Sequence, residues 1–136
     1  MVGSVALDVA MSYISSKGLT VTANKLITSS AKKITKNGIS KVEQHLATMD
    51  FDVANQVMVA RLKQIEQGTL KATIQDVNFY KHELLEKSYV AKGMSYEAAH
   101  VKALAKEGIK YEKGYQSLLY TDEALEAGDD YFRLGN

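Results

Sequence analysis

Two neighbouring segments of the chain carry the side chains best suited to proton transfer. His82 and Glu86 are four residues apart in one predicted helix, and Tyr96 and His100 are four residues apart in the next. Residues at this spacing lie on one face of a helix, and Gly93 ends the first helix so that the second can fold back on it. Because an imidazole exchanges protons near neutral pH, we expect the two faces to meet in an acid–base site.

These residue types suit a ribonuclease that uses no metal and no other cofactor. An imidazole, paired with a second imidazole or a carboxylate, can activate a 2′-hydroxyl and protonate the leaving oxygen, while a cationic side chain stabilises the phosphorane. Tyrosine rings can stack on unpaired bases. The sequence predicts catalytic roles for His82, Glu83, Glu86 and His100, and substrate-binding roles for Lys81, Arg61, Tyr80 and Tyr96.

Two alternatives use the same residues differently. In the first they are structural, since a Glu four residues from a His is a common stabilising pair worth about 0.2–0.5 kcal/mol, and tyrosines at helical spacing usually pack. In the second, His82, Glu86 and His100 bind one metal ion. The segment His-Glu-Leu-Leu-Glu lacks the second histidine of the His-Glu-x-x-His zinc motif, so the sequence favours a site without metal.

The composition predicts an all-α fold. The 136 residues, 46% of them hydrophobic, are enough for one domain that buries its own core. The absence of cysteine excludes disulfides and cysteine metal sites, and the absence of proline removes the main helix breaker. No apolar run is long enough for a membrane-spanning helix. We expect a single compact domain of five to seven short helices, with one small extended segment near 109–116.

The first part of the chain is patterned more weakly than the rest. It is rich in serine and threonine, with helices expected at 2–16 and 22–36 and a stop at Asn37-Gly38. From residue 39 the apolar periodicity sharpens, and it predicts helices at 39–49, 51–67, 74–92, 95–106 and 121–127. We therefore expect a helical lead-in or linker segment at 1–38 that packs on a main domain at 39–136.

Short local signals mark several helix ends. A capping box is predicted at Thr73 and Asp76, where Asp replaces the usual Glu or Gln. Ser40 is the expected N-cap of the helix at 39–49. Gly68 and Gly93 are the expected C-terminal stops of the two longest helices.

Five segments of the main domain resemble a known class of bacterial proteins. They are 39–46, 55–65, 76–86, 93–100 and 119–120, and the most specific are Phe-Tyr-x-His-Glu-Leu and Gly-Met-Ser-Tyr-Glu-x-Ala-His. Over residues 39–121 they resemble the C-terminal effector regions of bacterial polymorphic toxins of the contact-dependent growth inhibition, filamentous haemagglutinin-like and Rhs types.

This resemblance implies a function and a route to the target. Such effectors are secreted as the tip of a larger surface toxin, are delivered to the cytoplasm of a neighbouring cell, and are neutralised in the producer by a cognate immunity protein. Many are nucleases, and tRNA is a frequent substrate. A host cytoplasmic factor stays open as a further partner.

Two other functions stay open. The first is a membrane-acting toxin whose amphipathic start inserts and dissipates ion gradients. The second is a non-catalytic helical immunity or adaptor protein. Residues 93–136 hold eight acidic and five basic side chains, and this acidic end could bind a basic partner.

Overall fold

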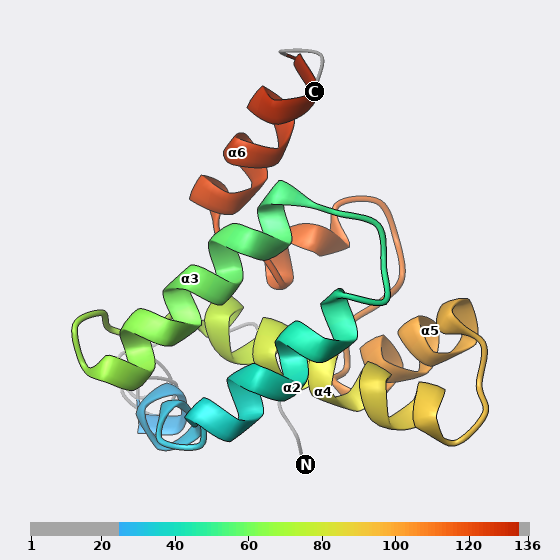
Figure 1. Ribbon diagram of the computed structural model, residues 1–136, viewed down its shortest axis with the longest axis horizontal. Helices are drawn as coiled ribbons and strands as arrows, with labels where there is room; N and C mark the ends of the chain where they lie inside the picture. Colours follow the sequence, from blue (N-terminus) through green and yellow to red (C-terminus); the bar gives the residue numbers. More distant parts are fainter. Residues whose placement is uncertain (1–24, 134–136) are drawn as a thin grey trace.

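Helix α4 lies at the centre of the fold, and the other helices are arranged around it (Figure 1). The computed structural model describes residues 25–133. Helices α2, α3 and α5 and the short 3₁₀ helix η1 contact α4, and α6 packs along α3. The elements span Lys36–Leu46 (α2), Val53–Gln67 (α3), Ile74–Ala91 (α4), Tyr96–Lys106 (α5), Tyr115–Leu118 (η1) and Asp122–Arg133 (α6). Residues 25–31 are helical as well.

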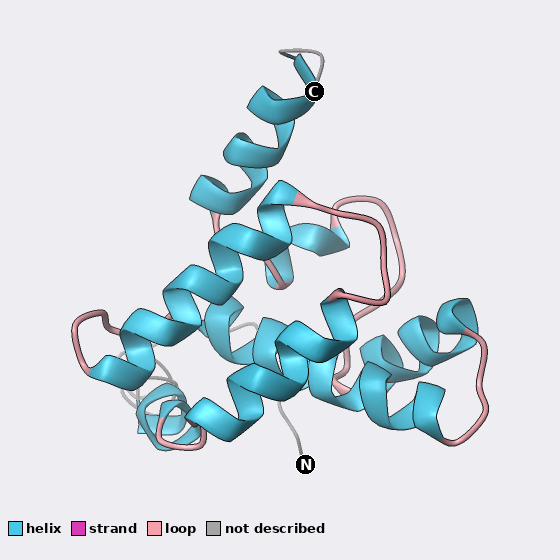
Figure 2. Cartoon of the chain, viewed as in Figure 1, coloured by secondary structure: helices cyan, strands magenta, loops and turns pink. Residues whose placement is uncertain are grey.

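The predicted all-α class is confirmed, since residues 25–133 contain helices joined by loops and no β-strand (Figure 2). The segment near 109–116 forms no strand: it runs through an irregular stretch and a turn into η1. An isolated strand would leave its backbone groups without partners. Within the described part of the chain, no helix combines the length and the apolar character needed to cross a bilayer. The helix expected at 2–16 lies outside the described residues.

The local signals at several helix ends act as predicted. Thr73 and Asp76 form the capping box at the start of α4, each side chain accepting a hydrogen bond from the other's backbone N–H. The hydroxyl of Ser95 accepts from the backbone of α5. Gly68 and Gly93, which follow α3 and α4, have φ angles of +83° and +101°, a conformation that favours glycine. These short-range interactions set the lengths of the two longest helices.

The start of α2 differs from the prediction. Thr35 caps the helix, not Ser40, and the Asn37-Gly38 pair lies in the first turn instead of ending a preceding helix. Gly38 is buried against Tyr80 of α4, and a Cβ atom at this position would overlap the Tyr80 hydroxyl. Glycine is therefore used here for close approach of two helices and not for a turn.

The boundary predicted between residues 38 and 39 consequently falls inside α2. Ile34, which precedes α2, is buried in the main hydrophobic cluster. Residues 34–38 thus pack on the same core as α2, α3 and α4, while most of the expected lead-in segment lies outside the described residues.

Two apolar clusters hold the helices together. The larger one joins residues of α2, α3, α4 and α6, and the smaller one consists of Leu104, Ile109 and Leu119. Tyr120 packs against both clusters, its ring lies edge-on to Phe79 at 5.5 Å, and its hydroxyl donates a 2.6 Å hydrogen bond to Asn55 Oδ1. Tyr120 therefore joins the α5 end of the molecule to the main core.

The contact between Gly38 and Tyr80 predicts a coupled pair of substitutions. We expect Gly38→Ala to lower the free energy of unfolding by about 1–3 kcal/mol, because the added methyl group overpacks the helix contact. Tyr80→Phe removes the hydroxyl that the methyl group would meet, so the double variant should be less destabilised than the sum of the single variants. Urea unfolding of the four proteins measures this coupling, and simple additivity would contradict the proposed contact.

Candidate active site

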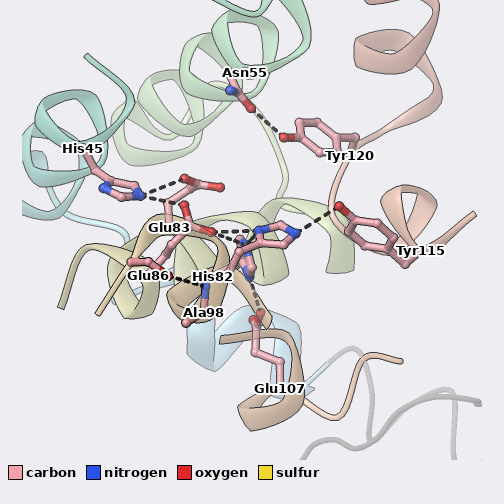
Figure 3. A network of polar contacts seen from close by, with 11 residues as sticks. His45, Asn55, His82, Glu83, Glu86, Ala98, Glu107, Tyr115 and Tyr120 are labelled. Atoms are coloured by element: carbon pink, nitrogen blue, oxygen red, sulfur yellow. Dashed lines mark hydrogen bonds and ion pairs between the residues drawn. The ribbon is translucent and has the colours of Figure 1, made fainter. Parts of the chain in front are cut away.

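Six titratable side chains from α2, α4, α5 and the C-cap of α5 form one cluster around the buried carboxylate of Glu86 (Figure 3). Helix α4 supplies Glu86 and two of its neighbours, α2 and α5 supply one imidazole each, and the residue that follows α5 supplies a further carboxyl group. The side chains are His45, His82, Glu83, Glu86, His100 and Glu107. We call this set the Glu86 cluster.

Glu86 is the centre of the cluster. Its Oε1 atom lies 2.7 Å from Nε2 of His45, and its Oε2 atom lies 3.1 Å from Nε2 of His82 and 2.8 Å from Nδ1 of His100. Burial to 1% exposure would by itself raise the pKa of this carboxyl, but the three imidazole hydrogen bonds outweigh it and lower the pKa well below its ordinary value. Glu86 is therefore ionised at neutral pH.

His82 lies between two carboxyl groups. Its Nε2 atom faces Glu86, and its Nδ1 atom lies 3.4 Å from Oε1 of Glu107, within ion-pair range but not aligned as a hydrogen bond. Burial lowers the pKa of His82, but the interactions with Glu107, Glu86 and Glu83 exceed this effect and raise it to about 10. In the metal-free protein this ring carries the positive charge that balances Glu86.

Glu83 faces His45 and not the other two histidines. Its Oε1 atom lies 3.8 Å from Nε2 of His45 and makes no hydrogen bond. Burial raises the pKa of Glu83 to about 8, so its side chain is mostly neutral at pH 7. Of the two carboxyl groups predicted to orient an imidazole, Glu86 is the one that contacts both His82 and His100.

His100 connects the cluster to the surface. Its side chain is 15% exposed, whereas that of His82 is 1% exposed. The rings of Tyr96, Tyr111 and Tyr115 surround it: Tyr96 is stacked on it at 6.0 Å, Tyr111 meets it edge-on at 5.6 Å, and the Tyr115 hydroxyl lies 3.0 Å from His100 Nε2. We call these three rings the tyrosine rim. Tyr96 and Tyr111 are about half exposed, so the rim is open to a ligand.

Eight site residues were predicted from the sequence. In the structure, four of them form a continuous chain of contacts. They are His82, Glu86, Tyr96 and His100. Glu83 lies beside them, facing His45. Lys81 is exposed. Burial raises the pKa of Glu107, and the positive charge of Lys81 opposes this with a smaller, lowering effect.

Arg61 and Tyr80 are engaged elsewhere. The Arg61 guanidinium forms two 2.8 Å hydrogen bonds with the buried carboxylate of Asp76 at the start of α4, and the Tyr80 hydroxyl donates to the carbonyl of Lys33. Both side chains therefore stabilise helix packing, and neither is free to bind a phosphate or a base. The predicted substrate-binding roles do not fit these positions.

Four residues of the site were not predicted from the sequence: His45, Glu107, Tyr111 and Tyr115. His45 lies among the apolar positions of an amphipathic helix, between Val42 and Leu46, and such a histidine needs a buried partner, so its pattern carried a usable signal. Glu107 is the C-cap of α5 and lies seven residues after His100, so the helical period places it on the same face as His100. Tyr111 and Tyr115 lie in the loop after α5 and in η1, where no helical period links them to the cluster.

Two sets of three side chains in the cluster have the ligand atoms that a metal ion requires. The first is His82, Glu86 and His100, and the second is His45, Glu83 and Glu86. In each set the ligand atoms lie within 4.8 Å of one another. Only the first set includes a residue at the surface, because the second is buried throughout.

Comparison of the chain with protein-family models, with curated proteins and with solved structures gave no match. The assignment of a function therefore rests on the geometry of the Glu86 cluster and on the resemblance carried by the sequence motifs.

The buried charges predict that the metal-free protein is most stable in mildly acidic solution. Folding raises the pKa of His82 from 6.5 to about 10 and that of Glu83 from 4.5 to about 8, so the folded state retains protons that the unfolded chain releases. We expect the free energy of unfolding to fall, by a few kcal/mol in order of magnitude, as the pH rises through these ranges. Urea unfolding at a series of pH values, in the presence of a chelator, measures this free energy.

Two observations check this pH dependence. Because the pKa of Glu86 is lowered, its contribution is present above pH 4.5 and is lost as the pH falls through the folded-state value, so stability should also decline in strong acid. The glutamine in Glu83→Gln cannot titrate. Between pH 4.5 and about 8, the pKa values of Glu83 in the unfolded and folded states, the free energy of unfolding should therefore fall less in this variant than in the parent protein. A stability that increases from pH 6.5 toward 10 would contradict the charge assignment.

Proposed function

We propose that this chain is the effector domain of an interbacterial toxin and that it cleaves RNA, with tRNA as the preferred substrate. The observation that carries the proposal is the Glu86 cluster itself: a buried, ionised carboxylate holds His100 from behind, while an open rim of tyrosines surrounds the same ring. Imidazole and carboxylate groups can transfer protons in phosphodiester cleavage, and exposed aromatic rings can stack on the bases of a single-stranded nucleic acid.

Only one imidazole of the cluster can meet a substrate in this arrangement. His100 reaches the surface, whereas His82 and Glu86 are each 1% exposed and lie behind it. We therefore assign contact with the scissile phosphodiester to Nε2 of His100, which exchanges its contact with the Tyr115 hydroxyl for one with the substrate, and we assign to Glu86 and His82 the role of positioning residues. A mechanism in which two imidazoles both touch RNA would need the tyrosine rim to move.

The surroundings of His100 suit a single-stranded nucleic acid. Tyr96 and Tyr111 present exposed ring surface on which bases can stack, a contact worth about 1–3 kcal/mol per base. Lys110 and Lys113 flank Tyr111 in the sequence and are exposed, so they can meet the phosphates on either side of a stacked base. These residues take the substrate-binding place that Arg61 and Tyr80 cannot fill.

The wider biological setting follows from the sequence resemblance. The domain would be secreted as part of a larger surface toxin, delivered to the cytoplasm of a target cell and neutralised in the producer by a cognate immunity protein. The described residues contain no helix suited to cross a membrane, and the proposal needs none, since the substrate is met in the cytoplasm. A host factor that activates the enzyme is compatible with it.

Inducible expression in a bacterium that lacks an immunity protein tests the proposal. We expect growth arrest and shortened RNA on a gel of total RNA, and we expect His100→Ala to abolish both. Glu97→Gln is the matched control, because Glu97 is exposed and one turn from His100 on the same helix. Circular dichroism should show unchanged helical content in both variants.

Other outcomes would favour the alternative functions. Growth arrest with intact RNA, leakage of dye from liposomes and indifference to His100→Ala would support a membrane-acting toxin. Normal growth on expression would support a non-catalytic immunity or adaptor protein.

The tyrosine rim yields a separate kinetic prediction. We expect Tyr111→Ala to raise KM for a single-stranded RNA about tenfold, the loss of one stacking contact, while leaving kcat within a factor of a few. Tyr131→Ala is a suitable control, because Tyr131 lies on α6 against Phe51 and not at the rim. A fall in kcat with unchanged KM would show that Tyr111 acts in the reaction and not in binding.

A further inference from the structure

We propose that His82 Nε2, Glu86 Oε2 and His100 Nδ1 are the ligands of one divalent transition-metal ion at the base of the tyrosine rim. The sequence favoured a site without metal because α4 lacks the second histidine of the zinc motif. The structure supplies that histidine from α5, since His100 faces the same carboxylate oxygen as His82. The inference concerns metal binding and does not depend on RNA cleavage.

The spacing of the three atoms suits a metal. They form a triangle with sides of 3.1 Å (His82 to Glu86), 2.8 Å (Glu86 to His100) and 3.2 Å (His82 to His100). For ligands about 2.0–2.1 Å from Zn²⁺, neighbouring ligand atoms are separated by about 2.9 Å at right angles and about 3.3 Å at the tetrahedral angle. Shifts of a few tenths of an ångström therefore suffice to place one ion in contact with all three atoms.

Each of these ligands faces a second polar group on its far side. Nδ1 of His82 faces Glu107 at 3.4 Å, the second oxygen of Glu86 lies 2.7 Å from His45, and Nε2 of His100 lies 3.0 Å from the Tyr115 hydroxyl. Partners of this kind fix the orientation of metal ligands, most often as carboxylate–histidine–metal arrangements. The outer groups leave the three inner atoms facing one another.

Three inward-facing acceptors need a cation between them. When both imidazoles are neutral, with the outer N–H of His82 facing Glu107 and that of His100 donated to the Tyr115 hydroxyl, their inner nitrogens and the Glu86 oxygen present lone pairs to one another at about 3 Å. Such an arrangement is repulsive in a buried site. Protons can relieve it in the metal-free protein, and a single divalent ion relieves all three contacts at once.

The site has an open side, as a catalytic metal requires. Three protein ligands leave at least one coordination position for water or substrate, and His100 with the tyrosine rim lies on the surface side. The other candidate set, His45, Glu83 and Glu86, is buried at all three residues, and Oε1 of Glu83 lies 3.8 Å from His45 without a hydrogen bond. His45 and Glu83 therefore fit better as groups that orient Glu86 than as ligands of a second metal ion.

The ligand set defines the class of metal. Two imidazoles and one carboxylate suit Zn²⁺, Fe²⁺ and related first-row ions, and they disfavour Mg²⁺ and Ca²⁺, which prefer oxygen ligands only. A bound ion of this class supplies Lewis acidity and a water of lowered pKa. In a nuclease, this chain's residues would orient that ion toward the phosphodiester of a strand whose bases stack at the rim.

Titration of the untagged, chelator-treated full chain with ZnCl₂ tests the proposal. We expect one Zn²⁺ per chain by isothermal calorimetry, with affinity reduced at least about 100-fold in His100→Ala, because loss of an outer partner alone costs 10–100-fold. Tyr115→Phe should weaken binding within that smaller range. Glu97→Gln is the control and should bind Zn²⁺ as the parent does.

A second measurement covers variants that fail to fold. Co²⁺ added to the parent protein should give visible absorption bands of four- or five-coordinate Co²⁺, and equimolar Zn²⁺ should remove them. The proposal is overturned by a parent protein that binds neither ion, or by unchanged Zn²⁺ affinity in folded His100→Ala. Metal binding with intact RNA on expression would refute the nuclease and keep the metal site, and RNA cleavage unaffected by chelator in a chain that binds no Zn²⁺ would do the reverse.

Discussion

The burial of one ionised carboxylate, Glu86, is the constraint on which the arrangement of α2, α4 and α5 depends. A carboxylate removed from water costs several kcal/mol unless charged or hydrogen-bonded partners surround it. Here the partners are three imidazoles, one from each of these helices. Any relative shift of the helices that withdrew a histidine would leave part of this charge uncompensated, so the polar cluster disfavours other packings of α2, α4 and α5.

The apolar core and the polar cluster have separate tasks. The larger hydrophobic cluster joins α2, α3, α4 and α6, and its exclusion of water provides the driving force for folding. The Arg61–Asp76 pair and the capping box fix the start of α4 within this core. The other half of α4 carries the Glu86 cluster and the contact with α5. One helix thus anchors the fold at one end and positions the candidate site at the other.

Little of the candidate site is exposed at the surface, because most of its side chains surround one buried carboxylate. His82, Glu83 and Glu86 are buried, and only His100 and the tyrosine rim are accessible. Such a cluster suits chemistry in which the protein holds one reactive group, or one ion, from behind and admits a substrate from a single side. It also separates the residues that can touch a ligand from those that only orient them.

The sequence by itself determined the features that depend on neighbours within a helix: the all-α class, the capping box of α4, the glycine ends of α3 and α4, and the pairings of His82 with Glu86 and Tyr96 with His100. These follow from the helical period, which is local. Only the tertiary structure decided that His45, Tyr111 and Tyr115 join the site, that Arg61 and Tyr80 serve packing, and that Gly38 lies inside a helix. Those outcomes depend on how helices distant in sequence cross and which faces they present, and no short-range pattern encodes that geometry.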